Sequence, residues 1–491
     1  MTRAAAVGVV GVGAMGAGIA QVAACAGHRV VLADALHGAA AGAAERIRKR
    51  VAELVAKGKL QPQTPDLDIR PAEIEAMGNC SLIIEAVTER LDVKADLFCR
   101  LESIVGEAAV LASNTSSLSL GAIASRLEHP GRFLGLHFFN PVPLMRLVEV
   151  IPGPATEPQT VDRARKVVEA WGKQAVISRA TPGFIVDRVA RPFYAESWRL
   201  LEERAASAEV IDRVMVAAGQ FRMGPFTLMD LIGHDVNEAV TRTVWESFGY
   251  DEWFTPSLAQ RLLVESGRFG RKTGRGIYDY TSDTELPVPQ PAGPRPAPAF
   301  VTAADDSELR PLIIRSEVPV MHADAPTRLP SGAIMARCDG RSAAALAYEL
   351  GSPVVVIDRC MDDATATGVA IAASDNCGPS DLSEAIGLLQ ACGLDVYPIA
   401  DVPGLVLTRT IAMLANLALD AVGRYVASAA DVDIAMKLGT GYPMGPLEWC
   451  DRWGARTVLR ILDELSDYYR DGHYRASPAL RRRAFAERLT R

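Results

Sequence analysis

The sequence AAAVGVVGVGAMG at residues 4–16 decides the fold of the first part of the chain. An apolar run ends in a turn where Gly11, Gly13 and Gly16 have the spacing GxGxxG, and a helix of small residues follows. In such a turn the first glycine permits the sharp bend, the second lets the backbone approach a pyrophosphate, and the third lets the helix pack against the strand. The N–H groups at the helix start, around Met15, attract phosphate. The turn therefore predicts a dinucleotide-binding site.

An acidic residue at the end of the next apolar run indicates which dinucleotide. Asp34 follows Val30-Val31-Leu32-Ala33. A carboxylate at this place can bind both ribose hydroxyls of an adenosine and repels a 2′-phosphate. Glycines also occur in ordinary turns, but here the strand, the helix and the acid agree. We therefore predict NAD as the cofactor.

The composition is that of an ordinary globular protein. The 491 residues are 49% hydrophobic and 23% charged, and this length favours about three domains. The formal net charge of −7 gives no sign of a nucleic-acid partner. The eight cysteines form no CxxC pair or zinc-type cluster, so we expect a reducing compartment and no metal. Without a signal sequence or a membrane-spanning run, we expect a cytoplasmic protein with no membrane partner.

The pattern along the chain predicts an α/β fold. Its N-terminal Rossmann-type parallel sheet is followed by an all-α domain, a small degenerate α/β domain and a second copy of the all-α domain. Six prolines between Pro287 and Pro298 indicate an extended spacer. In chain order we expect the Rossmann domain at 1–184, the helical domain at 185–281, the linker at 282–300, the reduced α/β domain without a nucleotide motif at 301–400, and the second helical domain at 401–491. The strands expected in the first sheet are Val7–Val10, Val30–Leu32, Leu82–Glu85, Val110–Ala112, Phe133–Leu136 and Val148–Ile151, and those expected in the reduced domain are Val354–Asp358 and Leu394–Tyr397.

The last ninety residues repeat an earlier segment. Pro182–Gly233 aligns without gaps with Pro403–Gly454 at an offset of 221, with 13 identities in 52 positions, where unrelated sequences would give roughly three or four. The shared Pro-Gly and Met-Gly-Pro steps mark turns between helices. The second copy should therefore repeat the helical architecture. Asp187 corresponds to Thr408, so a polar role there is not duplicated.

Polar side chains follow two expected strands of the first sheet. Asn114 and Ser116 come after Val110–Ala112, while His137 and Asn140 come at the end of the next strand, and Glu149 lies twelve residues past His137. The carboxyl ends of parallel strands meet at the edge where such sheets bind ligands. A carboxylate partner holds an imidazole in one tautomer and makes it a better base. We therefore predict that His137 and Glu149 form a catalytic pair.

Each of these residues also has a structural interpretation. His137 has apolar neighbours typical of a core histidine, and Glu149 could be a solvated strand residue. Ser116 could cap a helix, and Asn140 precedes a proline and could serve a turn. A hydroxyl and an amide beside a base also suit a substrate oxygen, and both roles can coexist.

Six stretches carry a resemblance to a known family. GVGAMGAG, IIEAVTERLDVK, ASNTSSL, GLHFFNPVPLMRLVEVI, TPGFIVDR and FGRKTGRGIYDY, in this order across residues 5–280, closely resemble the 3-hydroxyacyl-CoA dehydrogenases. The duplicated C-terminal half resembles the longer bacterial members of the phenylacetate pathway, which act on 3-hydroxybutyryl-CoA or 3-hydroxyadipyl-CoA. Residues 282–400 match only loosely.

The resemblance implies NAD-dependent oxidation of a 3-hydroxyacyl-CoA to the 3-oxoacyl-CoA. His137 would take the 3-hydroxyl proton, and Glu149 would orient His137 and balance its charge. Ser116 and Asn140 would hold the substrate oxygens and the nicotinamide edge. Beyond the glycine turn and Asp34, the implied cofactor contacts are Glu89, Lys94, Asn114 and Lys272; without the resemblance, the charged residues among these would be read as a solvated helix face or a basic loop.

The resemblance also implies residues that meet the substrate. Lys57 and Lys59 fall on a charged helix where family members meet the phosphates of coenzyme A, although a charge run is also typical of a solvated face. Asp187 stands where the family usually has asparagine. An amide can donate to a carbonyl oxygen whereas an ionised carboxylate only accepts. Asp187 is therefore protonated, otherwise partnered, or in a different contact with the substrate.

Two other functions stay open from the sequence. The chain could be another NAD-dependent hydroxyacid dehydrogenase, or a catalytically silent binding protein of the same fold. Short members of the family resemble dimers joined through their helical domains. The duplication leaves both a homodimer and a monomer with an internal pseudo-dimer open.

Overall fold

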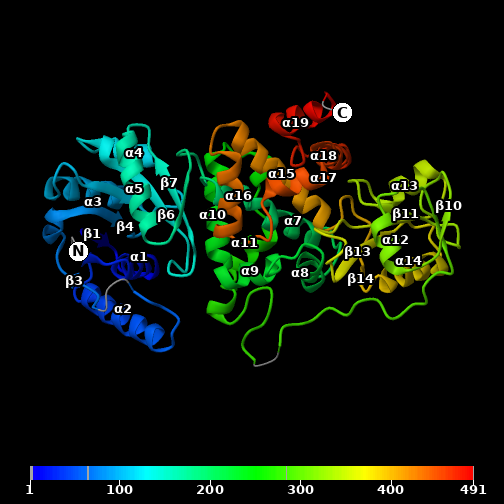
Figure 1. Ribbon diagram of the computed structural model, residues 1–491, viewed down its shortest axis with the longest axis horizontal. Coiled ribbons are helices and arrows are strands. Elements are labelled where there is room, and N and C mark those ends of the chain that lie inside the picture. The colour runs from blue at the N-terminus through cyan, green and yellow to red at the C-terminus, as the bar shows by residue number, and fades with distance from the viewer. Residues whose placement is uncertain (1–3, 63–65, 283–284, 490–491) are drawn as a thin grey trace. The chain divides into compact units, whose positions relative to one another are not determined.

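The computed structural model describes residues 4–62, 66–282 and 285–489; residues 283 and 284 of the predicted linker lie outside these ranges. The chain forms two compact units, Met1–Arg188 with Arg424–Thr440 and Val189–Gly423 with Gly441–Arg491. The first unit holds the large sheet, and the second holds the smaller sheets and most of the helices (Figure 1). No helix within the described ranges is long and apolar enough to cross a membrane.

The first unit is built on an eight-stranded sheet with the strand order β3-β2-β1-β4-β5-β6-β7-β8. All six strands expected in it are present. The bounds are β1 Ala4–Val10, β2 His28–Ala33, β3 Ile69–Pro71, β4 Cys80–Glu85, β5 Val110–Ser113, β6 Phe133–Phe138, β7 Leu147–Pro152 and β8 Gln174–Ile177. Strands β1 to β6 pair in parallel, which is the Rossmann arrangement that the glycine turn predicted.

One strand departs from the expected parallel pattern. β7 runs antiparallel to β6, and His137 lies opposite Glu149 in their register. Only residues 139–146 connect the two strands, and parallel neighbours need a crossover of about a dozen residues or more. The short connection therefore reverses the chain and places Glu149 directly beside His137.

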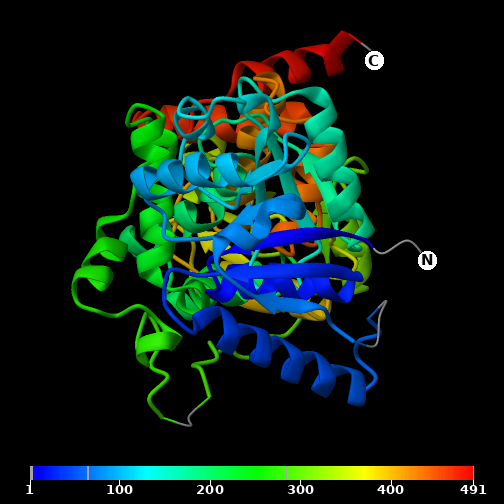
Figure 2. The ribbon, with the colours of Figure 1, turned by 90° about the vertical axis from the view of Figure 1, so that its left-hand side faces the viewer.

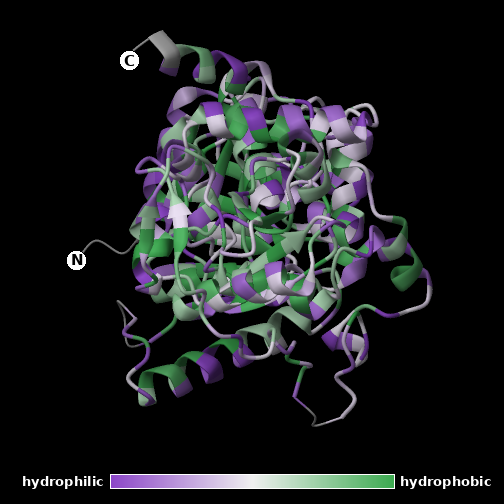
Figure 3. Cartoon of the chain, turned by 90° about the vertical axis from the view of Figure 1, so that its right-hand side faces the viewer, coloured by the Kyte–Doolittle hydropathy of each residue, from purple (hydrophilic) through white to green (hydrophobic). Residues whose placement is uncertain are grey.

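Helices cover both faces of this sheet, as alternate strand residues require. Val9 of β1 and Ile84 of β4 belong to one apolar core, and Ile83 belongs to the other. Figure 2 shows the blue strands with α2 below them, and Figure 3 shows hydrophilic and hydrophobic residues interleaved along α2. The helices are α1 Ala14–Cys25, α2 Ala39–Ala56, α3 Leu91–Ile104, α4 Leu120–Ala124 and α5 Pro158–Ala170.

The two helical segments have matching elements at equivalent positions of the sequence repeat. Helix α8 begins at Ala208 and α16 at Ala429, while α9 covers Pro225–Ile232 and α17 covers Pro446–Trp453. The structure thus places the same helices on both copies. The remaining helices of these segments are α6 Val186–Val189, α7 Arg191–Glu202, α10 His234–Ser247, α11 Leu258–Glu265, α15 Leu407–Gly423, α18 Ala455–Tyr469 and α19 Pro478–Leu489; α8 ends at Ala217 and α16 at Gly439.

A small α/β region separates the two helical segments. Its main sheet has the order β11-β12-β13-β14, with β9 and β10 as a separate pair. The two expected strands are present, but β11 and β13 were not expected. The sequence of β13, GVAIAA, is rich in glycine and alanine, which have low strand propensity. The elements are β9 Val301–Ala303, α12 Arg310–Ser316, β10 Val320–His322, β11 Ile334–Arg337, α13 Ala343–Leu350, β12 Val354–Ile357, β13 Gly368–Ala373, α14 Pro379–Ala391 and β14 Asp395–Pro398.

The proline-rich segment is extended, but it is held against the small sheet. Its described residues contain no helix or strand up to β9, and Figure 1 shows them as a long trace. The Ala292 N–H donates to the Val396 carbonyl at 2.8 Å, and the Gln390 amide donates to the Ala292 carbonyl at 3.0 Å. The segment is therefore a packed strap as well as a spacer.

Candidate active site

The glycine turn has the geometry that a bound pyrophosphate requires. Gly11 has a φ of +91°, which few other residues adopt. A Cβ on Gly16 would lie 1.8 Å from the Gly11 carbonyl oxygen, so helix and strand could not approach with any other residue. A Cβ on Gly13 would meet nothing within 4 Å, so the backbone there is open to a ligand. Met15 is half-buried in the first turn of α1.

The carboxylate of Asp34 lies beside this turn. Its two oxygens accept hydrogen bonds from the N–H groups of Val12 and Leu36, each at 2.9 Å. Asp34 is half-buried at the end of β2, the strand next to β1. The open glycine, the start of α1 and the adjacent carboxylate fit the pyrophosphate and the adenosine ribose of NAD.

A run of hydrogen bonds connects the glycine turn to the predicted base. The Ala86 N–H donates to Val10 at 2.8 Å, and the Asn114 N–H donates to Glu85 at 2.9 Å. The Asn114 side-chain oxygen in turn accepts from the Phe138 N–H at 2.9 Å. The carboxyl ends of β1, β4, β5 and β6 therefore form one continuous edge.

His137 and Glu149 form a buried pair at this edge. The His137 Nδ1 lies 2.6 Å from Glu149 Oε2, and both side chains are buried. Glu149 Oε1 accepts from the N–H groups of Ile185 at 2.9 Å and Val186 at 3.1 Å. Because a carboxylate only accepts, Nδ1 carries the proton and Nε2 is left as the acceptor.

The carboxylates around His137 make its imidazole a stronger base than burial alone would allow. Burial lowers the pKa of His137, but the hydrogen bond and charge of Glu149, together with the charges of Asp187 and Glu89, more than offset it and raise this pKa above the usual value. Two rings pack on the imidazole, with the Phe139 centroid at 4.4 Å and the Phe184 centroid at 5.7 Å. The imidazole is thus held in place by packing as well as by Glu149.

A second polar cluster lies between β4 and β5. Glu89 accepts hydrogen bonds from the Thr115 hydroxyl, from the Ser116 N–H at 3.2 Å and from the Ser117 hydroxyl at 3.0 Å. Lys94 is 1% exposed, and its ammonium pairs with Glu85 at 2.6 Å and Glu89 at 3.1 Å. Burial raises the pKa of Glu89, but Lys94 and the hydroxyl donors outweigh burial and hold it below the usual value. The Glu89 carboxylate is therefore held in place by these donors and by Lys94.

The other predicted site residues have different surroundings. Ser116 is half-buried and Asn140 is exposed, while Asp187 is half-buried one residue beyond Val186. Lys57 and Lys59 are both exposed just past the end of α2. All predicted site residues except Lys272 lie in the first unit. Lys272 belongs to the second unit, where its ammonium pairs with Asp235 at 2.6 Å.

Several residues around the pair were missed by sequence reasoning. Phe139 and Phe184 looked like ordinary core residues, and the N–H groups of Ile185 and Val186 carry no signal in a side-chain pattern. Glu85 had a weak signal, because it ends an apolar run just as Asp34 does. Their roles depend on contacts that only the folded chain shows.

The second half of the chain has no such pair among its described residues. At the same offset of 221 residues, Asp358 corresponds to His137, and it is buried just after β12. Its carboxylate accepts from the N–H groups of Val406 at 3.0 Å and Leu407 at 2.7 Å, the counterparts of Ile185 and Val186. Burial raises the pKa of Asp358 despite these hydrogen bonds. A carboxylate with a structural role thus occupies the position of the imidazole.

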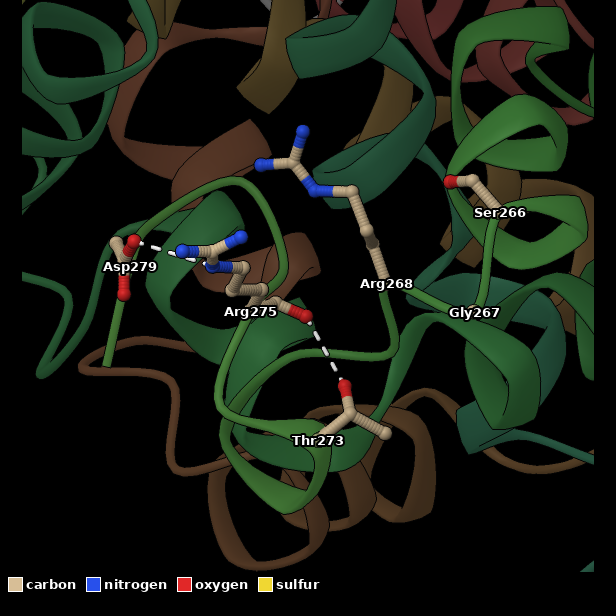
Figure 4. Close-up of a pocket in the computed structure, with 6 residues that line it drawn as sticks. All are labelled: Ser266, Gly267, Arg268, Thr273, Arg275 and Asp279. Atoms are coloured by element: carbon tan, nitrogen blue, oxygen red, sulfur yellow. Dashed lines mark hydrogen bonds and ion pairs between the residues drawn. The ribbon is translucent and has the colours of Figure 1, made fainter. Parts of the chain in front are cut away.

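A cavity of about 550 Å³ in the second unit does not include the predicted residues. Figure 4 shows its lining, where the Arg275 guanidinium turns to Asp279 at 3.2 Å. The lining residues are Ser266, Gly267, Arg268, Thr273, Arg275 and Asp279.

Three family models match successive parts of the chain. The 3-hydroxyacyl-CoA dehydrogenase NAD-binding domain matches residues 6–181, and the C-terminal domain of the same family matches residues 183–280 and again 404–491. The chain belongs to the 3-hydroxyacyl-CoA dehydrogenase family. The reduced Rossmann-fold domain of 3-hydroxybutyryl-CoA dehydrogenase matches residues 335–403. The repeat indicated the long form of the family, and the second match to the C-terminal domain agrees with it.

Relatives of both lengths support this membership. The chain is 42% identical to the 3-hydroxyadipyl-CoA dehydrogenase of Escherichia coli over 485 residues, 98% of each chain. It is similar to a crystal structure of 3-hydroxybutyryl-CoA dehydrogenase from Escherichia coli K12, with a TM-score of 0.92 and 40% identity over 99% of each chain. The human mitochondrial hydroxyacyl-coenzyme A dehydrogenase is 39% identical over 282 residues, 55% of this chain and 90% of the human protein. The predicted family, fold class, enzyme class and NAD cofactor are confirmed.

Proposed function

We propose that this NAD-dependent 3-hydroxyacyl-CoA dehydrogenase uses His137 as the general base. Glu149 orients the imidazole and balances its positive charge. The observation that carries the proposal is the buried pair, with Nδ1 bound to a carboxylate and Nε2 left to accept a proton. A base fixed in one tautomer at the ligand-binding edge is what removal of a hydroxyl proton requires.

The residues of the pair supply the proton transfer and its electrostatic balance. Nε2 of His137 takes the 3-hydroxyl proton as the C3–O bond becomes a carbonyl. Glu149 stabilises the resulting imidazolium, and the Ile185 and Val186 N–H groups prevent its carboxylate from turning away. The glycine turn and Asp34 would hold NAD, which would supply the acceptor for the hydride from C3. In the reverse direction the imidazolium returns the proton.

The residues between the glycine turn and the base would position the reactants. Ser116 and Asn140 can donate to the substrate oxygen and to the nicotinamide edge. Glu89 and Asn114 lie on the same edge and suit the cofactor. Lys94 is enclosed by carboxylates, so we infer that it acts on the cofactor through Glu89. The resemblance alone supports a cofactor contact for Lys272.

The exposed lysines after α2 suit the phosphates of coenzyme A. Lys57 and Lys59 can offset phosphate charge because neither is buried. Replacing both with alanine should raise KM for the acyl-CoA about tenfold and leave kcat and KM for NAD nearly unchanged. An unchanged KM for the acyl-CoA would show that these lysines belong only to the solvated surface at the end of α2.

The substitution His137→Gln tests the assignment of the base. Gln keeps a polar group of similar reach but cannot accept and hold a proton, so turnover should fall by about 10³-fold or more. NADH binding, measured by fluorescence titration, should remain because His137 is not part of the glycine turn. Near-normal turnover in this variant would remove the assignment.

The acyl group of the substrate is the finer part of the proposal. The long curated relative is named for 3-hydroxyadipyl-CoA and the long crystal structure for 3-hydroxybutyryl-CoA, so we propose one of these two thioesters. The ratio of kcat/KM for the two thioesters decides between them. The corresponding free hydroxy acids are measured in the same assay. Equal rates with free acids would favour a general hydroxyacid dehydrogenase instead.

A further inference from the structure

The sequence repeat extends from the helices into the sheets. Strands β7 and β8 begin at Leu147 and Gln174, and β13 and β14 begin at the equivalent positions, Gly368 and Asp395. β7 is antiparallel to β6 and parallel to β8, and β13 has the same relation to β12 and β14. The second half therefore repeats the sheet edge that carries Glu149, in addition to the helices.

The helices of the two repeats are exchanged between these sheet edges. The Arg179 N–H, after β8, donates to the Val426 carbonyl at 2.7 Å, and the Ala400 N–H, after β14, donates to the Ala205 carbonyl at 2.9 Å. The two donors occupy equivalent positions in the repeats, and so do the two acceptors. Helix α16 of the second repeat packs on β7 and β8, and α8 of the first repeat packs on β13. The strand that carries Glu149 is thus covered by a helix from the second half of the chain.

The last residue of α16 is a glycine that its backbone does not require. Gly439 lacks a positive φ, and a helical glycine costs about 1 kcal/mol relative to alanine. A Cβ there would lie 2.7 Å from Leu147 Cδ2, 3.1 Å from Val186 Cγ2 and 3.8 Å from Phe139 Cε1. The counterpart in the first repeat is Ala218. Close approach to the first sheet accounts for the glycine.

Each of these three neighbours either contacts a member of the catalytic pair or lies beside it on the same face of a strand. Leu147 points to the same face of β7 as Glu149, two residues on. The Val186 N–H donates to Glu149 Oε1 at 3.1 Å. The Phe139 ring packs on the His137 ring at 4.4 Å. A Cβ at position 439 would therefore displace the Leu147 side chain and crowd Val186, both next to Glu149, and would touch the Phe139 ring that packs on His137.

We propose that Gly439, supplied by the second repeat, is a positioning residue for His137 and Glu149. This inference rests on the proposed role of His137 as the base. The missing side chain lets α16 pack closely against Leu147, Val186 and Phe139. The distance between the imidazole and the carboxylate is thereby preserved. A displacement of about 1 Å at reacting groups can cost about a hundredfold in rate. The second half of the chain thus acts on catalysis through the positions of His137 and Glu149.

The substitution Gly439→Val tests the proposal, with Ala218→Val as its matched control. Ala218 is fully buried against the second sheet edge, where its carbonyl accepts from the Met361 N–H, but no imidazole lies there. Both variants should lower Tm through overpacking. Only Gly439→Val should lower kcat, by about tenfold or more, and shift the acidic limb of the pH profile, with KM for NAD unchanged.

The outcomes separate this inference from the proposed function. Equal losses in the two variants, in proportion to folded protein and with unchanged pH profiles, would overturn the role of Gly439. If Gly439→Val does not fold, Gly439→Ala decides, because its single methyl must still displace Leu147; a normal kcat and pH profile then refute the role. High activity of His137→Gln would instead refute the base, whatever the Gly439 variants show.

Discussion

Replacing Glu149 with glutamine should remove most of the activity by changing the tautomer of His137. Glutamine keeps the shape of the side chain, and its oxygen can continue to accept from the Ile185 and Val186 N–H groups. Its NH₂ group then faces His137 Nδ1, which must become an acceptor. The imidazole proton consequently moves to Nε2, the atom that takes the substrate proton in the proposed mechanism.

The magnitude follows from the contacts of the carboxylate. Turning the amide over would set its NH₂ against two N–H donors, and leaving buried donors unsatisfied costs about 1–3 kcal/mol each. The productive tautomer is therefore about 2 kcal/mol or more above the unproductive one. Loss of the charge opposite the imidazolium adds to this cost. A barrier increase of about 4–5 kcal/mol corresponds to a fall of about 10³ to 10⁴ in kcat.

The assay is the rate of NADH formation from 3-hydroxybutyryl-CoA and 3-hydroxyadipyl-CoA at saturating NAD. Asp358→Asn is the matched control, because it neutralises an equally buried carboxylate that accepts from the corresponding N–H groups of Val406 and Leu407. Both variants should lose stability, but Asp358→Asn should keep kcat within about twofold. If Glu149→Gln kept more than a tenth of the activity, the tautomer argument would be wrong.

Four further substitutions have distinct expected outcomes. Gly13→Ala should leave Tm unchanged, since nothing lies within 4 Å of the new Cβ, but weaken NAD binding about tenfold or more in calorimetry; Gly16→Ala, with its Cβ 1.8 Å from a carbonyl oxygen, should lower stability by about 3 kcal/mol or more in denaturant unfolding. Asp187→Asn removes a negative charge that raises the pKa of His137, so the acidic limb of kcat/KM should move to lower pH, and a shift to higher pH would contradict that role. Asp34→Asn should reduce the preference for NAD over NADP about tenfold in kcat/KM, and an unchanged preference would show that the ribose is recognised elsewhere.

The features that sequence predicted well depend on local chemistry. The glycine turn could be predicted because each glycine answers a separate steric demand, and Gly11 and Gly16 show those demands directly. The pairing of His137 with Glu149 could be predicted because both lie in apolar runs near one sheet edge, where a polar side chain needs a partner.

The features that sequence missed depend on contacts between distant segments. The burial of Lys94 follows from Glu85, which lies on another element and has no distinguishing pattern. The strand β13 lacks β-branched residues over most of its length and is stabilised by its neighbours in the sheet. The close contact of Gly439 with the first sheet results from the exchange of helices between the repeats. The hydrophobic periodicity of neither segment indicates this exchange.

The exchange of helices also changes how the active site responds to dilution. When a helix that supports a site comes from a separate molecule, its presence depends on protein concentration and a dissociation constant. Here α16 is joined to the strand it covers through the same polypeptide, so its effective concentration is set by the tether and does not fall when the protein is diluted. Dilution should therefore not remove α16 from the strand that carries Glu149, and the second repeat acts as a permanently attached partner of that strand.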